Sequence, residues 1–218
     1  MASLSILLNP DITQHIPYDP ADIEVVSTRP QKRIEIVEAD PIWPSKFAEL
    51  EALIKAAFAK FDSSDNLLYI QHVGSTSVPT LPAKAVIDID IVVSDPEAEE
   101  IYVPALKSAG FQFLHREPKW HQHRFFGCER PHYTNLHVFG PGSPEVIRHR
   151  LFRDWLRDPK NQGDRDVYAS AKRRAAREAR EREETVQKYT DRKEPIIREI
   201  LRKIYRDRGL LEDSGKGH

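Results

Sequence analysis

Two short segments of the sequence carry groups that suit phosphate and metal chemistry. The first, residues 71–79, places Gly74 and Ser75 at the end of an apolar stretch. The second places Asp88 and Asp90 between isoleucines. Successive side chains of a strand point to opposite faces, so the two carboxylates share one face and the isoleucines share the other. We expect both acids to face solvent beside a buried apolar layer.

Paired carboxylates of this kind suit Mg²⁺ or Mn²⁺, which bridge the phosphates of a nucleoside triphosphate. Gly74 permits close approach of the backbone, and the N–H groups of Ser75 and Thr76 are expected to hold a phosphate oxygen. Lys84 adds a positive charge nearby. Taken singly, these features also suit the wet face of an ordinary strand and an ordinary turn. The spacing of the two segments favours the phosphate and metal interpretation.

Three of the nine histidines have a spacing that suits a metal site. His121 and His123 are two residues apart, so both imidazoles face the same side if this segment is a strand, and His137 is expected on a neighbouring strand. Three such nitrogens suit Zn²⁺, with Asp88 or Asp90 completing the site. Alternatively, His121 and His123 contact substrate or form surface hydrogen bonds. His137 is open as a metal ligand, an acid/base group or a buried, hydrogen-bonded side chain.

Several cations are further candidates for binding phosphate. Arg124 belongs to the strand face opposite the histidines unless a bulge intervenes, and it is expected to reach a phosphate from the strand end. Arg153 suits a bidentate clamp on phosphate, or alternatively an ion pair with Asp154. Lys172 and Lys193 match positions of a known family, and on that resemblance they are candidates to direct charge into the same cleft.

The segment from about Ile34 to Ile204 resembles the GrpB family, a branch of the polymerase β-like nucleotidyltransferase superfamily. The motifs that carry this resemblance are His72-Val73-Gly74-Ser75-Thr76-Ser77-Val78-Pro79, Ala83-Lys84, Asp88-Ile89-Asp90, Trp120-His121-Gln122-His123-Arg124, Leu136-His137-Val138, Phe152-Arg153-Asp154, and Tyr189 with Lys193.

The resemblance implies a nucleotidyltransferase fold, with nucleotide phosphates held near His72 and the turn that follows it. Active members of the superfamily usually offer a third carboxylate on a neighbouring strand, where this sequence has His137. The resemblance therefore implies that His137 is the third metal ligand or the base. Some bacterial relatives are joined to a coenzyme A biosynthetic kinase, which points to a cofactor-like phosphometabolite.

Composition narrows the class of protein. A chain of 218 residues with 39% hydrophobic residues can bury one sizeable core. The formal net charge of -1 gives no general attraction to nucleic acid or to an anionic membrane. The single cysteine, Cys128, excludes an intramolecular disulfide and is expected to be a packed strand residue. The absence of a long apolar run or a basic, apolar leader predicts a cytoplasmic protein.

The hydrophobic pattern predicts an α+β domain with a small mixed sheet flanked by helices and a helical C-terminal half. Residues 1–33 are interpreted as an irregular arm, 34–206 as the domain and 207–218 as a flexible tail. Strands are predicted at 67–73, 86–93, 111–115, 124–128 and 135–139, and helices after Asp40, before Gly110, from Pro144 onward, at 165–188 and at 192–206.

The sequence thus predicts a metal-dependent nucleotidyltransferase that moves AMP from ATP to an unidentified small molecule or protein. Two alternatives remain open. One is a non-catalytic module that binds a nucleotide or phosphometabolite. The other is a different enzyme that uses a histidine-lined transition-metal site on the same scaffold.

Overall fold

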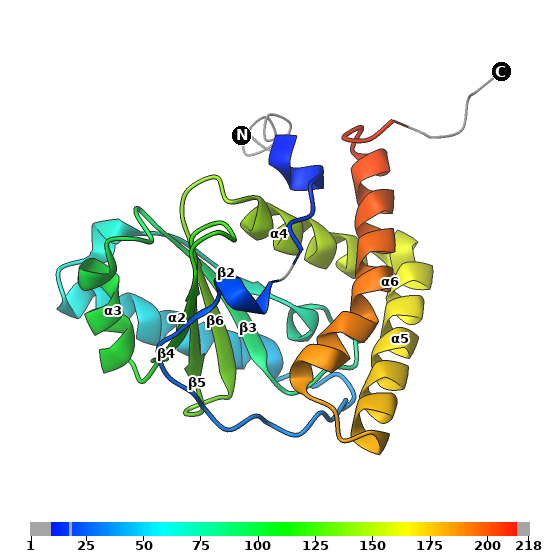
Figure 1. The fold of residues 1–218 in the computed structure, drawn as a ribbon, viewed down its shortest axis with the longest axis horizontal. Helices are drawn as coiled ribbons and strands as arrows, with labels where there is room; N and C mark the ends of the chain where they lie inside the picture. Colours follow the sequence, from blue (N-terminus) through cyan, green and yellow to red (C-terminus); the bar gives the residue numbers. More distant parts are fainter. Residues whose placement is uncertain (1–9, 18, 213–218) are drawn as a thin grey trace.

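The computed structural model describes residues 10–17 and 19–212. A six-stranded mixed sheet forms its centre, with helices at its sides (Figure 1). The strands lie in the order β1-β4-β5-β6-β3-β2. Their bounds are β1 Glu24–Val25, β2 Leu67–Val73, β3 Ile87–Val93, β4 Gln112–Glu117, β5 His123–Cys128 and β6 Thr134–Phe139. The predicted α+β class is confirmed.

The pairing of β3 with β6 is the only parallel one among the described strands; every other neighbouring pair is antiparallel. In this register Asp88 lies opposite Asn135, and Asp90 lies opposite His137. On its other side, β3 pairs with β2 so that Asp90 faces Gln71. The sheet therefore aligns residues that are far apart in the sequence.

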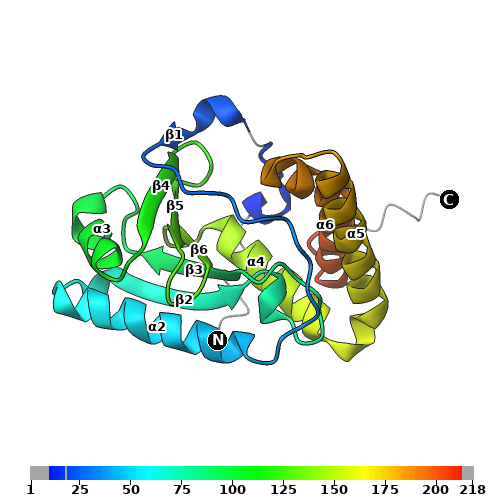
Figure 2. The same ribbon diagram turned by 90° about the horizontal axis from the view of Figure 1, so that it is seen from below.

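One face of the sheet is apolar and is covered by α2 (Trp43–Lys60) and α3 (Glu99–Ser108). Helix α2 begins as the sequence predicts, with Pro44 in its first turn, where the missing N–H costs nothing. Its buried residues Leu50, Ile54 and Phe58 pack in one cluster with the inward side chains of β3 and β6. Figure 2 shows α2 running along this face.

The C-terminal part is helical, with α4 (Pro144–Arg157), α5 (Gln162–Glu181) and α6 (Val186–Asp207). The break between the last two helices was predicted after Lys188 and lies several residues earlier. Glu183 adopts a φ of 52°, and the side chain of Thr185 caps α6 by accepting a hydrogen bond from the backbone N–H of Lys188. The Thr185 cap fixes where α6 begins. The charged composition of this region does not by itself show where one helix ends and the next begins.

The N-terminal arm is not wholly irregular. Its strand β1 extends the sheet by pairing with β4, and shortly after the arm Val37 forms a bridge with Ala83. Ile12 is buried in a cluster with residues of α4 and α6. Between these contacts the arm passes over the sheet face opposite α2 (Figure 2). None of the helices in the described part of the chain combines the length and the apolar composition of a membrane span.

Candidate functional site

The sheet face opposite α2 is lined by polar side chains from five strands. Alternation along each strand and the register between strands bring them into one row across the sheet. They are Gln71 of β2, Asp88 and Asp90 of β3, Asn135 and His137 of β6, His123 of β5, and His115 and Glu117 of β4.

Asp88 lies against the turn that follows β2. Gly74 begins this turn with φ 66° and ψ -171°, a conformation that is open essentially to glycine alone. A Cβ atom on Gly74 would lie 2.9 Å from Cγ of Asp88, and the nearest Asp88 atom would be Oδ2. The other oxygen, Oδ1, accepts a hydrogen bond of 2.8 Å from Nδ2 of Asn135. Burial raises the pKa of Asp88 above its ordinary value, against the opposing effects of Asn135 and nearby lysines.

The turn itself is held from the other side of the sheet. The hydroxyl of Thr76 donates to the carbonyl oxygen of Val86 at 3.0 Å and lies 3.0 Å from Nε2 of His72. The His72 ring stacks on Phe47 of α2, with 4.9 Å between ring centroids. Burial, together with nearby arginines, lowers the pKa of His72 to about 3, so this imidazole is neutral. His72 and the Thr76 hydroxyl therefore support the turn, and they lie on the sheet face away from Asp88.

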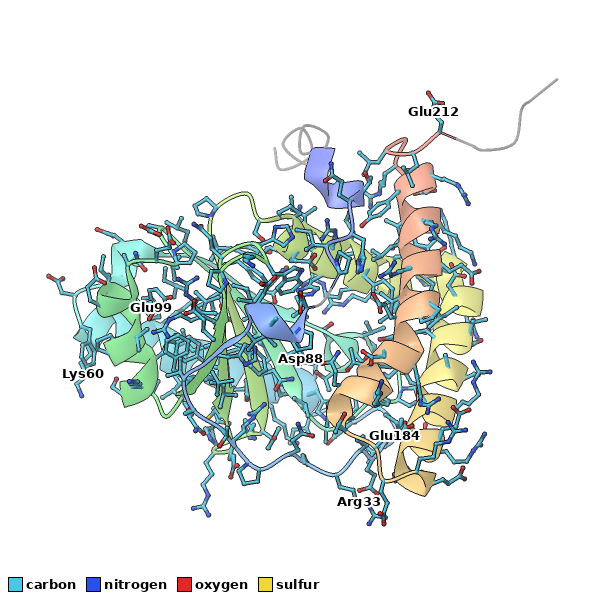
Figure 3. The ribbon with its side chains drawn as sticks, in the orientation of Figure 1. Arg33, Lys60, Asp88, Glu99, Glu184 and Glu212 are labelled. Atoms are coloured by element: carbon cyan, nitrogen blue, oxygen red, sulfur yellow. The ribbon has the colours of Figure 1, made fainter. Side chains whose placement is uncertain are left out.

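Three lysines from different segments surround the same corner. The ammonium nitrogens of Lys84 and Lys193 lie 5.3 and 4.2 Å from the ring centroid of Tyr189. Lys172, which is 2% exposed, donates a 2.5 Å hydrogen bond to the carbonyl oxygen of Pro82. Figure 3 shows Asp88 in this region, between the sheet and α6.

The lysines perturb one another's protonation. Burial, and then the charge of Lys84, lowers the pKa of Lys193 to about 8, although Asp88 acts in the opposite direction. Burial likewise lowers the pKa of Lys84, and it lowers that of Lys172 strongly. A cluster of partly desolvated cations beside one carboxylate favours a bound anion, since an anion replaces the solvation that the lysines have lost.

Asp90 differs from its neighbour because it is fully buried, so the expectation that both acids face solvent is wrong. Its Oδ2 accepts a hydrogen bond from Nε2 of Gln71 at 3.0 Å. Nδ1 of His149, on α4, lies 3.1 and 3.0 Å from the two Asp90 oxygens. Burial lowers the pKa of His149, but the attraction and hydrogen bond of Asp90 outweigh it, so the net shift is upward. The pair joins α4 to the centre of the sheet.

Beyond Asp90, the row continues as a chain of imidazoles. Nδ1 of His137 lies 3.0 Å from Nε2 of His123, and Nδ1 of His123 lies 2.5 Å from Oε2 of Glu117. The same oxygen is 3.6 Å from Nε2 of His115. Burial lowers the pKa of His137 and of His123, whereas Glu117 has a pKa lowered to about 2 because hydrogen bonds from His115 and His123 outweigh its burial.

The structure does not bring the remaining predicted residues to Asp88. His121 is not in a strand: it lies in the turn before β5 with φ 55°, and its Nε2 is 3.8 Å from Glu145. Arg124 lies on the opposite sheet face, where its Nε donates to Glu99 at 2.8 Å. Glu99 is the first residue of α3, and Figure 3 shows it well away from Asp88. Arg153 donates to the carbonyl oxygen of His72 at 2.9 Å and also pairs with Asp154.

Several residues of the site were not singled out from the sequence, and two of them, Arg29 and His149, come from outside the sheet. Arg29 of the arm donates to the carbonyl oxygen of Thr134 at 2.9 Å and to the side chain of Asn135, the residue that holds Asp88. Gly127 leaves room for this guanidinium, since a Cβ there would overlap it. His149 is the second. Its only signal in the sequence is a position four residues after Glu145 on an amphipathic helix, which many surface histidines share.

Comparisons with known proteins agree on one family. A family model described as GrpB protein matches residues 33–203. The UPF0157 protein BH1888 of Halalkalibacterium halodurans is 42% identical over 171 residues, which cover 78% of this chain and 82% of that protein. The UPF0157 protein PA4798 of Pseudomonas aeruginosa is 36% identical over 172 residues, covering 78% and 66%.

Two further likenesses extend this result. A dephospho-CoA kinase of Mycolicibacterium paratuberculosis is 29% identical over 208 residues, which cover 83% of this chain but only 48% of the kinase. The crystal structure of conserved protein GrpB from Enterococcus faecalis shares the fold, with a TM-score of 0.63 at 24% identity, over 78% of this chain and 99% of that one. The matched segment contains Gly74, Asp88, Asp90 and all three clustered lysines, and the chain belongs to the GrpB family.

Proposed function

We propose that the corner formed by Gly74, Asp88 and the three lysines binds the phosphates of a nucleoside triphosphate, and that the protein transfers a nucleotidyl group. In the simplest such reaction the substrate is ATP, and AMP is transferred to an acceptor that is a small molecule or a protein. The observation that carries this proposal is the convergence of one half-buried carboxylate and three desolvated lysines on a glycine turn.

The phosphate-binding part of the proposal rests on charge. Lys84, Lys172 and Lys193 come from the loop before β3, from α5 and from α6, so folding brings together three lysines whose charged forms repel one another. Such an arrangement costs stability without an anion and gains it with one. A triphosphate supplies several negative charges and many acceptor oxygens, and the backbone N–H groups beside Gly74 add uncharged donors.

The residues of β3 fit a divalent metal in part. Oδ2 of Asp88 faces the turn, and Oδ1 accepts a hydrogen bond from Asn135. Carboxylates that bind metals are commonly oriented by a hydrogen bond of this kind. Asp90 already accepts from Gln71 and faces His149, yet a carboxylate has about four lone-pair positions and retains capacity for a metal. Bound there, Mg²⁺ or Mn²⁺ would neutralise charge developing on the transferred phosphate.

The chain's own groups have separable tasks in this proposal. The turn and the lysines hold the phosphates, and Asn135 fixes the orientation of Asp88. His149 lies close to Asp90 and has a raised pKa, so it is a candidate to hold or accept a proton near the acceptor. His137 lies opposite Asp90 in the place where the superfamily usually has a third carboxylate, and we propose it as a further ligand or base.

A turnover experiment tests the proposal. The protein is incubated with ATP labelled at the α-phosphate, with Mg²⁺ or Mn²⁺ and a cell extract as the source of acceptors. We expect label to move to an acceptor with release of pyrophosphate, and Asp88→Asn to abolish both. A matched control is Asp95→Asn, because Asp95 is an exposed acid beyond the end of β3. Equal turnover in wild type and Asp88→Asn contradicts the proposal.

A second candidate function is a non-catalytic module that binds a nucleotide or phosphometabolite. It is favoured by His137, an imidazole in the place of the third acid, whose Nδ1 is already hydrogen-bonded to His123. The similarity to part of a dephospho-CoA kinase is consistent with either candidate. Saturable nucleotide binding without pyrophosphate release, across metals and nucleotides, selects the binding module.

A further inference from the structure

We propose that His115, Glu117 and His123 form a second metal site, which binds Zn²⁺ or a similar borderline divalent metal. Within the described part of the chain, these are the residues whose ligand atoms converge as a metal requires. One nitrogen from each imidazole and one Glu117 oxygen all lie within 4.8 Å of one another. Asp88, Asp90 and His137 do not form a group of that kind among the described residues.

The β4–β5 hairpin builds this site from a short piece of sequence. His115 and Glu117 are two apart on β4, after the bulge at residues 113–115, so their side chains share a face. The turn at 118–122 then returns the chain so that His123 lies directly opposite Glu117. Positive φ angles at His121 and Gln122 make this return tight. A hairpin is a rigid support for ligands, because its register fixes their spacing.

The distances are close to those of a zinc site. Zinc binds imidazole nitrogen and carboxylate oxygen at about 2.0–2.2 Å, so ligand atoms around one tetrahedral ion are separated by roughly 3.4 Å. The contacts of Glu117 with His123 and His115, at 2.5 and 3.6 Å, lie on either side of that value. A side-chain shift of about 1 Å brings the shorter contact to that separation, and the third pair of ligand atoms, one nitrogen from each imidazole, lies within 4.8 Å.

The surroundings supply the support that a metal-binding imidazole needs. Coordination through Nδ1 of His123 leaves its Nε2–H to donate to Nδ1 of His137, at 3.0 Å. Hydrogen bonds of this kind fix the ring and its tautomer in metal sites. Trp120 and Phe139 pack on His123, with ring centroids 5.0 and 4.8 Å away. The side chain of His115 is 26% exposed, so the ion has an entry path and an open position for water or substrate.

This inference does not rest on the proposed nucleotide site. His123 lies two strands away from β3, or roughly 10 Å at the usual spacing of neighbouring strands. The donor set also differs in kind: two imidazoles and one carboxylate favour borderline metals, whereas carboxylates alone favour Mg²⁺. The two sites are therefore expected to bind different ions, and His137 is the residue that they share.

Titration of the metal-free, untagged protein with Zn²⁺, and with Co²⁺ as a spectroscopic probe, tests the site. We expect one tight Zn²⁺ per chain, and bound Co²⁺ to show the visible absorption of a low-coordinate site. Loss of a supporting residue costs metal sites about 10–100-fold in affinity. We therefore expect His137→Ala to weaken binding by that factor, and His115→Ala and Glu117→Gln to weaken it by at least about 100-fold.

The controls separate this site from ordinary surface binding and from the nucleotide site. His132 and Glu49 form a pair of the same residue types elsewhere, at 2.7 Å, so His132→Ala should leave the affinity unchanged. Asp88→Asn should also leave it unchanged. Circular dichroism confirms folding, and the partly exposed His115 provides a variant if Glu117→Gln does not fold. Equal affinity in wild type and His115→Ala, or loss of the tight Zn²⁺ in Asp88→Asn alone, overturns the proposal.

Discussion

The carboxyl group of Asp88 packs against Gly74 and occupies the space where a side chain on Gly74 would lie. Gly74 also has a φ of 66° with an extended ψ, a backbone conformation that residues with a side chain avoid. The turn that we propose for phosphate binding and the carboxylate that we propose for the metal are thus fixed relative to each other.

Gly74→Ala is therefore expected to lower the free energy of unfolding by about 1–3 kcal/mol and to displace Asp88 or the turn. Metal-dependent ATP binding should be lost with it. Gly163→Ala is the matched control, because Gly163 lies in α5 and a Cβ there meets no atom within 4 Å. Urea denaturation and ATP titration of both variants check this. An undisturbed affinity in Gly74→Ala would show that the turn does not contact the nucleotide.

The two acids of β3 should respond differently to loss of charge. Burial raises the pKa of Asp88, so its ionised form costs stability once the pH exceeds the ordinary value of 3.8. Asp88→Asn should then keep or increase the free energy of unfolding at pH 7. Asp90→Asn removes the anion that Gln71 and His149 contact inside the protein. It should lower the free energy of unfolding by about 1–3 kcal/mol. Urea denaturation at pH 7 distinguishes them, and equal losses would contradict this account of their surroundings.

The lysine cluster predicts a dependence on alkaline pH. Between the folded pKa of Lys193, about 8, and its ordinary value of 10.5, the unfolded chain holds a proton that the folded chain releases. The stability of the free protein should therefore rise with pH across that window. Nucleotide affinity should fall there, by up to about tenfold per pH unit for one lysine.

Lys193→Arg provides the control for this pH effect. A guanidinium stays charged at pH 10, so this variant should bind ATP with a flatter pH profile than the wild type. Titrations at pH 7, 8, 9 and 9.5 compare the two proteins. Parallel pH profiles would mean that Lys193 takes no part in binding the phosphates.

The N-terminal arm is expected to contribute to binding through Arg29. This side chain contacts Asn135, which in turn holds Asp88. Arg29→Ala should weaken metal-dependent ATP binding by about tenfold, the lower end of the effect for a residue that supports a metal ligand. Arg33→Ala, an exposed arginine of the same segment, should leave it unchanged (Figure 3). If both variants bind as the wild type does, the arm has no role at the site.

Much of the sheet was predictable because its strands show clear periodicity. The alternation in residues 87–93 predicted both the strand and the shared face of Asp88 and Asp90. The burial of Asp90 was not predictable, because it depends on α4, which lies more than fifty residues later and places His149 over the carboxylate. Alternation shows which residues share a face, and it does not show what covers that face.

Other features depended on contacts between distant segments. Arg29 lies in a proline-rich segment without periodicity, and only the folded chain shows that it reaches Asn135. The turn at His121 contains no glycine, so its residue types do not predict the positive φ angles of His121 and Gln122. The family motif made Lys193 a candidate, whereas its lowered pKa follows from burial and from the charge of Lys84, which depend on the packing of α6.

We propose above that Asp88 and the lysines beside it bind a nucleotide together with a divalent metal. Calorimetric titration of ATP into wild type, Asp88→Asn and Lys193→Met, each with Mn²⁺ and with EDTA, tests it most directly. We expect the wild type to bind ATP saturably and only with Mn²⁺. Asp88→Asn should lose binding or its metal requirement, and Lys193→Met should bind more weakly with the metal requirement unchanged. Identical affinity in all three proteins, or binding that EDTA does not affect in the wild type, would contradict it.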